Sequence, residues 1–289
     1  MRNLHMERRD FIKTLGVIGG TALTGKKLQA EEKLKSEDKE FVGILVDTTR
    51  CVGCQACSEA CAEAHGLPEP DLDEEITLTR KPSTTQWTVI RGDEDKEIYI
   101  KTQCMHCNQP ACASACPTQA MYKTPEGPVI WQEDKCMGCR FCMISCPFDI
   151  PKFEYDSPIP KIQKCIMCWE RLQEGEEPAC TEACPEEAIV FGKRRELIEE
   201  ARSRIYNNPD DYVHHIYGEH EAGGTGYMYL SAVPFEELGF RTNLDKNSYP
   251  ELTTNFLYSV PIILTLWPAF LLALNNATKP DEENEESED

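Results

Sequence analysis

The sequence lacks the short motifs of several large enzyme classes. It contains no P-loop, no dinucleotide-binding fingerprint and no nucleophile elbow, so neither nucleotide chemistry nor a hydrolase triad is indicated. Positive charge is also scarce, since 30 lysine and arginine residues stand against 50 aspartate and glutamate residues, for a formal net charge of −20. Because a protein that binds duplex nucleic acid needs a basic surface, we expect no nucleic acid partner. The mean hydropathy of −0.48 excludes a protein with many membrane spans but allows a single one.

Cysteine is the residue type that the sequence has in abundance. The chain of 289 residues contains 16 cysteines, which fall into four groups of four. Each group ends with a gap of three residues, and a proline follows the last cysteine in every group but the first, where Ala62 takes its place. In chain order the groups are Cys51, Cys54, Cys57 and Cys61; Cys104, Cys107, Cys112 and Cys116; Cys136, Cys139, Cys142 and Cys146; and Cys165, Cys168, Cys180 and Cys184.

This spacing predicts iron–sulfur clusters. Groups one and three have the full C-x2-C-x2-C-x3-C run with which bacterial ferredoxins hold cubane [4Fe–4S] clusters. The gaps of two residues let a tight loop turn several thiolates toward one cluster, while the fourth cysteine points to a second cluster. A proline after the fourth cysteine stops the chain from continuing regularly. Because all four groups are complete and no cysteine is left over, we expect four [4Fe–4S] clusters per chain.

Two other uses of the cysteines stay open on the residues alone. Exported proteins often form disulfides, and the number of cysteines is even, but a disulfide framework gives no reason for four repeated C-x2-C pairs. Zinc ribbons also contain C-x2-C pairs, but they need no third cysteine two residues further on. The repeated spacing therefore favours iron and sulfide over both alternatives.

The four groups resemble the four-cluster iron–sulfur subunits of membrane-bound oxidoreductases, a family that includes the β subunits of formate dehydrogenase and of the dimethyl sulfoxide reductase group. The resemblance covers residues 41–195. It is most detailed in the segments CVGCQAC at 51–57, QCMHC at 103–107, GCRFCM at 138–143 and CPFDIPK at 146–152. Within the family, the sequence most resembles the iron–sulfur subunit of hydrogenase-2-type complexes, through GGT at 223–225, VPFE at 233–236 and features of both chain ends.

The resemblance implies an α+β fold of two ferredoxin-like modules with long loops, each module holding two clusters. It pairs group one with group four, and group two with group three. The implied ligand sets are set A, Cys51, Cys54, Cys57 and Cys184; set B, Cys61, Cys165, Cys168 and Cys180; set C, Cys104, Cys107, Cys112 and Cys146; and set D, Cys116, Cys136, Cys139 and Cys142.

The segments between the cysteines predict the regular elements and one insertion. β-forming residues at the right spacing predict strands at 97–101, 129–131 and 188–191. Helical spacing and the ligand loops predict helices at 60–65, 113–116 and 194–206. Residues 66–96, with an acidic run at 71–75, form an insertion that is either a solvated loop or a contact loop for a partner.

The first thirty residues resemble an export signal. Arg8 and Arg9 precede a weakly apolar run and then a small residue, Ala30, at a plausible cleavage point. That order is typical of twin-arginine signals, although an ordinary basic amphipathic helix is an alternative. We expect residues 1–30 to be a twin-arginine signal peptide, which suits a protein that folds around its cofactors before export.

The other end of the sequence carries its one long apolar run. Residues 256–274 contain no charged side chain, and at about 1.5 Å per residue they come close to the hydrocarbon thickness of a bilayer. Pro261 and Pro268 are better tolerated in membrane helices than in soluble ones. We expect a single transmembrane helix here, or alternatively a helix buried against a partner. It follows a C-terminal extension at 196–252 and precedes an acidic tail at 275–289.

Together these features predict a non-catalytic electron-transfer subunit at the periplasmic face of the cytoplasmic membrane. By the resemblance, four clusters carry electrons between a periplasmic catalytic subunit, a nickel–iron hydrogenase in hydrogenase-2-type complexes, and an integral membrane subunit that reacts with quinone. The first alternative is the same role beside a molybdenum enzyme such as formate dehydrogenase. Such subunits often lack a signal of their own, so Arg8 and Arg9 favour the hydrogenase. The second alternative is a zinc-binding or structural scaffold.

Overall fold

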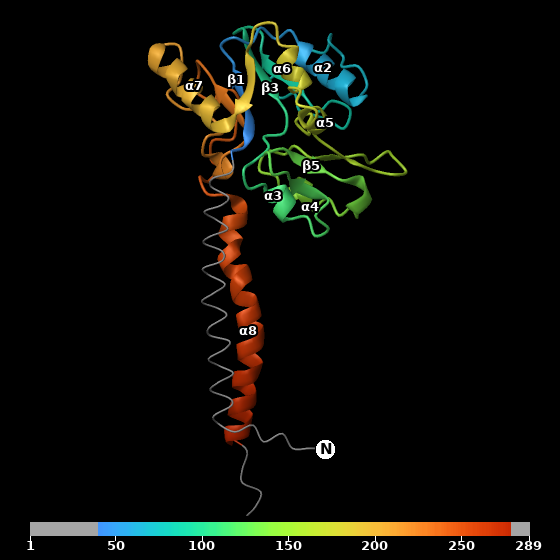
Figure 1. The fold of residues 1–289 in the computed structure, drawn as a ribbon, viewed down its shortest axis with the longest axis vertical. Helices are drawn as coiled ribbons and strands as arrows, with labels where there is room; N and C mark the ends of the chain where they lie inside the picture. The colour runs from blue at the N-terminus through green and yellow to red at the C-terminus, as the bar shows by residue number, and fades with distance from the viewer. Residues whose placement is uncertain (1–39, 279–289) are drawn as a thin grey trace, which may run out of the picture.

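The computed structural model describes residues 40–278. The predicted export signal at residues 1–30 lies outside the described residues, and so does the predicted acidic tail from residue 279 onward. Figure 1 shows a head of short helices and strands, from which one long helix, α8 (Tyr249–Thr278), extends away. The predicted combination of helices and strands is confirmed.

The largest sheet of the head joins segments from both ends of the described chain. β1 (Val42–Asp47) lies in its centre, antiparallel to β8 (Ile189–Lys193) and parallel to β9 (Tyr227–Leu230). The helix α7 (Arg194–Asn207) packs against β1 and β8. Residues of the C-terminal extension thus complete the chain's own sheet, which the sequence did not predict.

Side chains of β1 alternate between two cores, because successive residues of a strand face opposite sides of the sheet. Leu45 faces α7 and packs with Leu197. Ile44 faces the opposite side, in a core that also contains Cys57 and Cys180. One face of the sheet is therefore covered by a helix, and the other face lies against the cysteine loops.

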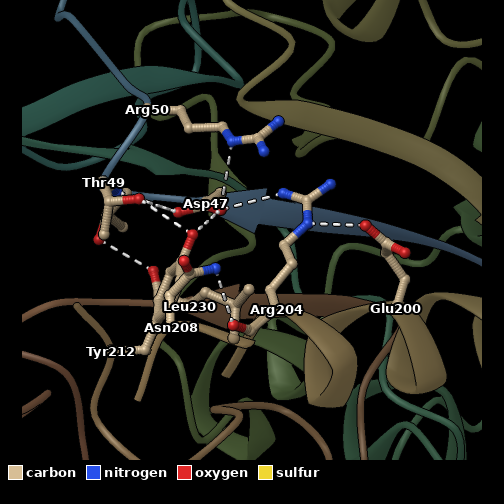
Figure 2. Close-up of polar contacts among 9 residues, drawn as sticks. Asp47, Thr49, Arg50, Glu200, Arg204, Asn208, Tyr212 and Leu230 are labelled. Carbon is tan, nitrogen blue, oxygen red and sulfur yellow. Dashed lines mark hydrogen bonds and ion pairs between the residues drawn. The ribbon is translucent and has the colours of Figure 1, made fainter. Parts of the chain in front are cut away.

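A buried carboxylate at the end of β1 ties the helix to the sheet (Figure 2). Asp47 is 0% exposed and accepts hydrogen bonds from Nη1 of Arg204 at 3.0 Å and from the hydroxyl of Tyr212 at 2.9 Å. The hydroxyl of Thr49 donates to the same carboxylate at 2.6 Å. Because every oxygen of Asp47 has a partner, the cost of burying its charge is offset.

Hairpins and short helices make up the rest of the head. The hairpins pair β2 (Val89–Asp93) with β3 (Ile98–Thr102), β4 (Met121–Lys123) with β5 (Val129–Trp131), and β6 (Lys152–Phe153) with β7 (Ile162–Gln163). The short helices are α2 (Ala56–His65), α3 (Ala111–Ser114), α4 (Phe141–Ser145), α5 (Trp169–Gln173) and α6 (Ala179–Glu182), with 3-10 turns η1 (Glu133–Lys135) and η2 (Glu221–Gly223). The predicted strands are confirmed as β3, β5 and β8, and the predicted helices as α2, α3 and α7.

The apolar run near the carboxy terminus lies inside a helix that is longer than the predicted 256–274. Within the segment Tyr249–Asn276 of α8, the most apolar stretch of 18 residues has a mean hydropathy of 2.0. None of that 18-residue stretch is buried within the chain. The helix is long and apolar enough to cross a membrane by length and composition. Its first turn meets the head, where Glu251 accepts a hydrogen bond from the side chain of Gln109 at 2.9 Å.

Candidate metal centre

The cysteines lie in loops that the backbone bends through left-handed conformations. Such residues reverse the chain direction within a few positions, so that cysteines on either side face the same space. The left-handed residues of these loops are Gly53, Gln55, His106, Gly138, Arg140, Met167 and Cys168. At Gly53 a side chain is also excluded by space, because a Cβ there would lie 2.7 Å from the ring of Tyr99.

The prolines explain why three ligand helices are short and one is long. In groups two, three and four, the chain turns directly after the Cys-Pro pair, and the third residue after the cysteine is left-handed. Its N–H donates to the carbonyl of that cysteine, as in Gln119 to Cys116 at 3.2 Å and Asp149 to Cys146 at 3.3 Å. In group one, Ala62 allows α2 to continue to His65. The predicted role of proline as a helix stop is confirmed.

The thiols of set A line one cavity, although they come from groups one and four. The cavity has an empty volume of about 380 Å³, part of it open to solvent. Its walls include the apolar side chains of Val46, Ile90 and Ile189. The four thiols of set A that line it are Cys51, Cys54, Cys57 and Cys184. A thiol-lined apolar cavity of this kind fits a [4Fe–4S] cluster, whose irons bind thiolates.

The cysteines of set B affect one another's pKa values. The pKa of Cys61 is raised to about 11, mainly by burial and in part by the thiolate charges of Cys180 and Cys168. Burial also raises the pKa of Cys165, again with contributions from Cys61 and Cys180. Metal ligation deprotonates thiols, so these buried groups need positive charge beside them, which iron would supply.

Set C lies in the middle of the sequence, with Cys104 and Cys112 buried and Cys107 and Cys146 partly buried. Burial raises the pKa of Cys107 well above its ordinary value. The thiolate charges of Cys146, Cys104 and Cys112 add to this shift, in that order. The helices α3 and α4, which carry groups two and three, pack against each other, and this contact explains why the two groups meet.

Set D lies beside set C and is closer to the surface. The pKa of Cys142 is raised to about 11, mainly by burial and in part by the charges of Cys116, Cys136 and Cys139. Cys139 is exposed, as is Cys54 in set A. The structure thus places the thiols of set A around one cavity, and charge effects link cysteines within each of the sets B, C and D. Sets A and D each have one thiol at the surface.

Cysteines of one set also affect the pKa of cysteines in the next set. The charge of Cys180 in set B contributes to the raised pKa of Cys57 in set A, that of Cys104 in set C to the raised pKa of Cys165 in set B, and that of Cys142 in set D to the raised pKa of Cys112 in set C. Within residues 40–278, no three side chains of Cys, His, Asp or Glu come close enough to hold a single metal ion. The fit to clusters thus rests on the cavity of set A and on the grouping of the sulfurs.

Several N–H groups donate to the sulfurs. The backbone N–H of Met167 reaches Sγ of Cys165 at 3.3 Å, and that of Gly138 reaches Sγ of Cys136 at 3.4 Å. Nε2 of His65 lies 3.3 Å from Sγ of Cys168. Such hydrogen bonds stabilise the anionic form of a cluster ligand and raise its potential. Sequence reasoning missed His65, because only the folded structure shows that the end of α2 lies next to Cys168 of group four.

Three lysines near the sulfurs were also missed from the sequence. Lys101 and Lys164 are buried and Lys123 is partly buried, although lysine is rarely buried without a partner. Lys123 and Lys164 donate to backbone carbonyls, including that of Cys107 at 2.8 Å and that of Cys165 at 2.9 Å. The one signal in the sequence is their position next to the cysteine loops. Lys101 lies in β3, Lys123 ends β4, and Lys164 directly follows β7.

The insertion at residues 66–96 packs in part against the ligand loop of group one. Arg80 is 7% exposed and donates to Oε1 of Gln55 at 2.7 Å and to Glu74 at 2.8 Å. Gln55 in turn donates to the carbonyl of Leu72 at 3.2 Å. The acidic run at 71–75 is exposed. The insertion therefore supports the set A loop, a role that neither predicted alternative included.

Comparison with known proteins agrees with this site. Residues 96–194 match the family described as 4Fe-4S dicluster domain. A protein of Nitratidesulfovibrio vulgaris is 42% identical over 289 residues, which cover 96% of this chain and 78% of that protein. The hydrogenase-2 operon protein HybA of Escherichia coli O157:H7 is 36% identical over 312 residues, covering 93% of this chain and 92% of HybA.

A further relative belongs to a different enzyme complex. The iron–sulfur subunit of the nitrate-inducible formate dehydrogenase of Escherichia coli K12 is 34% identical over 204 residues, covering 66% of this chain and 68% of that subunit. The predicted resemblance is confirmed by both kinds of relative. The chain belongs to the family of iron–sulfur electron-transfer subunits that includes HybA of hydrogenase-2 and the iron–sulfur subunits of formate dehydrogenases.

Proposed function

We propose that this chain carries electrons through four [4Fe–4S] clusters, held by the sets A, B, C and D, between a catalytic subunit and an integral membrane subunit that reacts with quinone. The observation that supports the proposal is that each set has a cysteine close enough to a cysteine of the next set, in the order A, B, C, D, for its charge to affect the other's pKa. When bound, such clusters accept one electron at a time, so a row suits the stepwise transfer of electrons from a two-electron donor.

The two ends of the row support an assignment of direction in space. Cys54 of set A and Cys139 of set D are exposed, so each end offers a ligand at the surface to a partner. The helix α8 leaves the head next to α3, which carries Cys112 of set C. We therefore assign set A to the catalytic subunit and set D to the membrane subunit.

The catalytic partner is assigned from the extent of similarity. HybA aligns with 93% of this chain, whereas the nitrate-inducible formate dehydrogenase subunit aligns with 66%. A nickel–iron hydrogenase is therefore our first candidate for the electron donor. A formate dehydrogenase or another molybdenum enzyme is the second candidate, because 34% identity over the aligned residues supports it as well.

The location of the protein follows from its two ends. We assign residues 1–30 as a twin-arginine signal, 41–195 as the four-cluster domain and 196–252 as an extension. Residues 256–274, within α8, are assigned as a transmembrane anchor that holds the head at the periplasmic face, and 275–289 as a tail. The exposed apolar side chains of α8, Phe256, Leu264, Trp267 and Leu272 among them, support the anchor.

The number of clusters is tested by metal analysis of the full chain purified without oxygen. Four cubanes require about sixteen iron and about sixteen acid-labile sulfide per chain. A reproducible iron content near half that amount would contradict the count of four. Stoichiometric zinc without sulfide would support the scaffold alternative instead.

The role as an electron conduit is tested in the assembled complex with Cys116→Ser. Serine is a harder, poorer ligand for iron, so the set D cluster should be altered or lost while sets A and B keep theirs. The complex should still reduce an artificial dye at its catalytic subunit but lose reduction of quinone. Ser114→Ala, at the exposed last residue of α3 and two positions before Cys116, is the matched control. Quinone reduction that persists without the set D cluster would contradict the linear row.

The export signal and the membrane anchor are tested separately. Replacing Arg8 and Arg9 by lysine should leave the protein in the cytoplasm, whereas the single change Arg2→Lys, outside the pair, should not. Ending the chain after residue 255 should release the head from washed membranes, provided that partner subunits are absent. Export without the arginine pair, or membrane retention of the isolated head, would contradict the corresponding assignment.

A further inference from the structure

We propose that Lys101 is the fixed positive charge that raises the reduction potentials of the clusters in sets A and B together. The inference rests on the proposed function, since it requires clusters in both sets. It assigns a positioning role to a residue that is not a ligand and that lies on β3, outside all four cysteine groups.

Lys101 is the most deeply buried cation of the head that lacks a backbone partner. The side chain is 0% exposed, and its Nζ donates to Oε1 of Gln103 at 3.0 Å and lies 5.1 Å from the centre of the Tyr227 ring. Within residues 40–278 no carboxylate forms an ion pair with it. Because a buried charge without a counter-charge is very costly, an anion is expected beside it.

The groups that supply this negative charge are the cysteines of sets A and B. Lys101 lines the cavity of set A. Burial lowers the pKa of Lys101, but the thiolate charges of Cys180, Cys57 and Cys165 outweigh it and raise the pKa overall. Cys57 belongs to set A, and Cys180 and Cys165 belong to set B. Lys101 thus lines the set A cavity and lies close enough to the sulfurs of set B for their charges to raise its pKa.

The other two lysines near the sulfurs show what Lys101 does not do. Lys123 donates to the carbonyls of Cys107 at 2.8 Å and of Gly127 at 2.6 Å. Lys164 donates to the carbonyls of Val129 and Cys165. The ammonium groups of both lysines thus donate their hydrogen bonds to backbone carbonyls. The ammonium of Lys101 makes no such hydrogen bond in the described part of the chain, and its charge is left to face the sulfurs.

A hydrogen-bonded ring holds the one partner of Lys101 in place. Nε2 of Gln103 donates to the hydroxyl of Tyr229 at 2.7 Å, and that hydroxyl donates to the backbone carbonyl of Lys101 at 3.0 Å. This arrangement fixes the amide so that its oxygen, and not its nitrogen, faces the ammonium. The position of the charge is therefore set by structure.

The consequence for the potentials follows from charge. Reducing a cluster by one electron adds one negative charge, which a nearby cation stabilises more than it stabilises the oxidised form. Screening is weak because the site is buried. Removing the cation should therefore lower the potentials of both neighbouring clusters, and it should leave the clusters of sets C and D almost unchanged.

The test is a redox titration of the assembled complex, followed by electron paramagnetic resonance. In Lys101→Met, which keeps an unbranched side chain only one atom shorter, the signals of sets A and B should shift to lower potential and those of sets C and D should stay. Lys101→Arg keeps the charge and should keep the potentials. In the matched control Lys123→Met, only the set C signal should move, since the sulfurs around Lys123 are those of Cys107, Cys104 and Cys112.

Each outcome decides the matter. Unchanged potentials in Lys101→Met, with all clusters present, would overturn the inference. If Lys101→Met assembles poorly, iron content replaces the titration as the readout: retention in Lys101→Arg supports the charge role, and equal loss in both variants assigns Lys101 to packing and overturns it. If the wild-type protein itself shows no cluster signals, the proposed function fails rather than the role of Lys101.

Discussion

Two regions of the head hold their cysteines in different ways. The outer region, residues 40–102 and 165–248, contains sets A and B beside the β8–β1–β9 sheet, whose central side chains are fully buried. The middle region, residues 103–164, contains sets C and D between two small hairpins, and its core includes the ligands Cys112 and Cys142 themselves. The outer region therefore has a protein core of its own, whereas the cysteine sites form much of the core of the middle region.

This difference indicates that metal binding contributes more to the folding of the middle region. A segment that has few apolar side chains to bury must obtain stability elsewhere, and metal binding supplies it in many small domains. In α4 the only buried residue is Cys142. In α7, by contrast, Leu197, Ile198 and Ala201 are buried against the sheet. The two regions should therefore respond differently to the loss of iron and to mutation.

The largest difference is expected when iron is removed. Stripping the protein of iron without oxygen should abolish amide protection throughout the middle region, because the free energy of metal binding is its folding free energy. The strands β1, β8 and β9 should keep measurable protection. Hydrogen exchange with peptide resolution measures both regions in one sample. Equal loss of protection in β1 and in the β4–β5 hairpin would contradict the comparison.

The second prediction concerns the outer region alone. In Asp47→Ala, Arg204 loses the buried carboxylate that it contacts at 3.0 Å, and Tyr212 loses its acceptor (Figure 2). Removing one partner of a buried ion pair costs about 3–5 kcal/mol. Native-state hydrogen exchange should show this loss in α7 and β1, while the middle region keeps its protection.

The exposed pair of Lys161 and Glu133 is the matched control for that change. Their side chains meet at 2.8 Å, but both are largely exposed. Since an exposed ion pair contributes about 0–1 kcal/mol, Glu133→Ala should change the protection of either region little. A loss of α7 protection in the control, or none in Asp47→Ala, would show that the network of Asp47 does not hold the helix to the sheet.

The residue that follows the last cysteine of a group can be exchanged between alanine and proline. Ala62→Pro gives group one the Cys-Pro pair of the other groups, but position 62 lies inside α2. Proline there removes a helical hydrogen bond and clashes with the preceding turn, at a cost of about 3 kcal/mol or more. We expect faster loss of the set A and B iron signals during denaturation. The reverse change, Pro185→Ala, lies outside a helix and should have a much smaller effect.

The parts of the site that are formed by residues close together in the sequence could be predicted from the sequence. The repeated spacing of cysteines marks the ligand loops, and Ala62 in place of proline marks the one ligand helix that continues. The contacts made by Asp47, which lie 157 residues away at Arg204, leave no local pattern. Lys101 resembles any residue of a short strand until the loops are folded around it. What sequence reasoning missed thus depends on contacts between distant segments.

The smallest effect is expected on the exposed face of the middle region. Ile144 in α4 is 80% exposed, and Met137 and Phe141 beside it are also exposed. Because substitutions on an exposed surface usually change stability by less than about 0.5 kcal/mol, Ile144→Ser should leave the protection of the isolated chain unchanged. Leu45→Ala, at a fully buried position of β1, should cost about 2–5 kcal/mol.

The same pair of variants separates stability from partner contact. Exposed apolar side chains are typical of an interaction site when they form a patch, and these three lie in the same stretch of sequence as Cys139, the exposed thiol of set D. In the assembled complex, Ile144→Ser should therefore slow quinone reduction while dye reduction at the catalytic subunit stays constant. Leu45→Ala should instead weaken the outer region with or without partners. If Ile144→Ser destabilised the isolated chain as much as Leu45→Ala does, the middle region would have a packed protein core after all, and its dependence on metal would have to be abandoned.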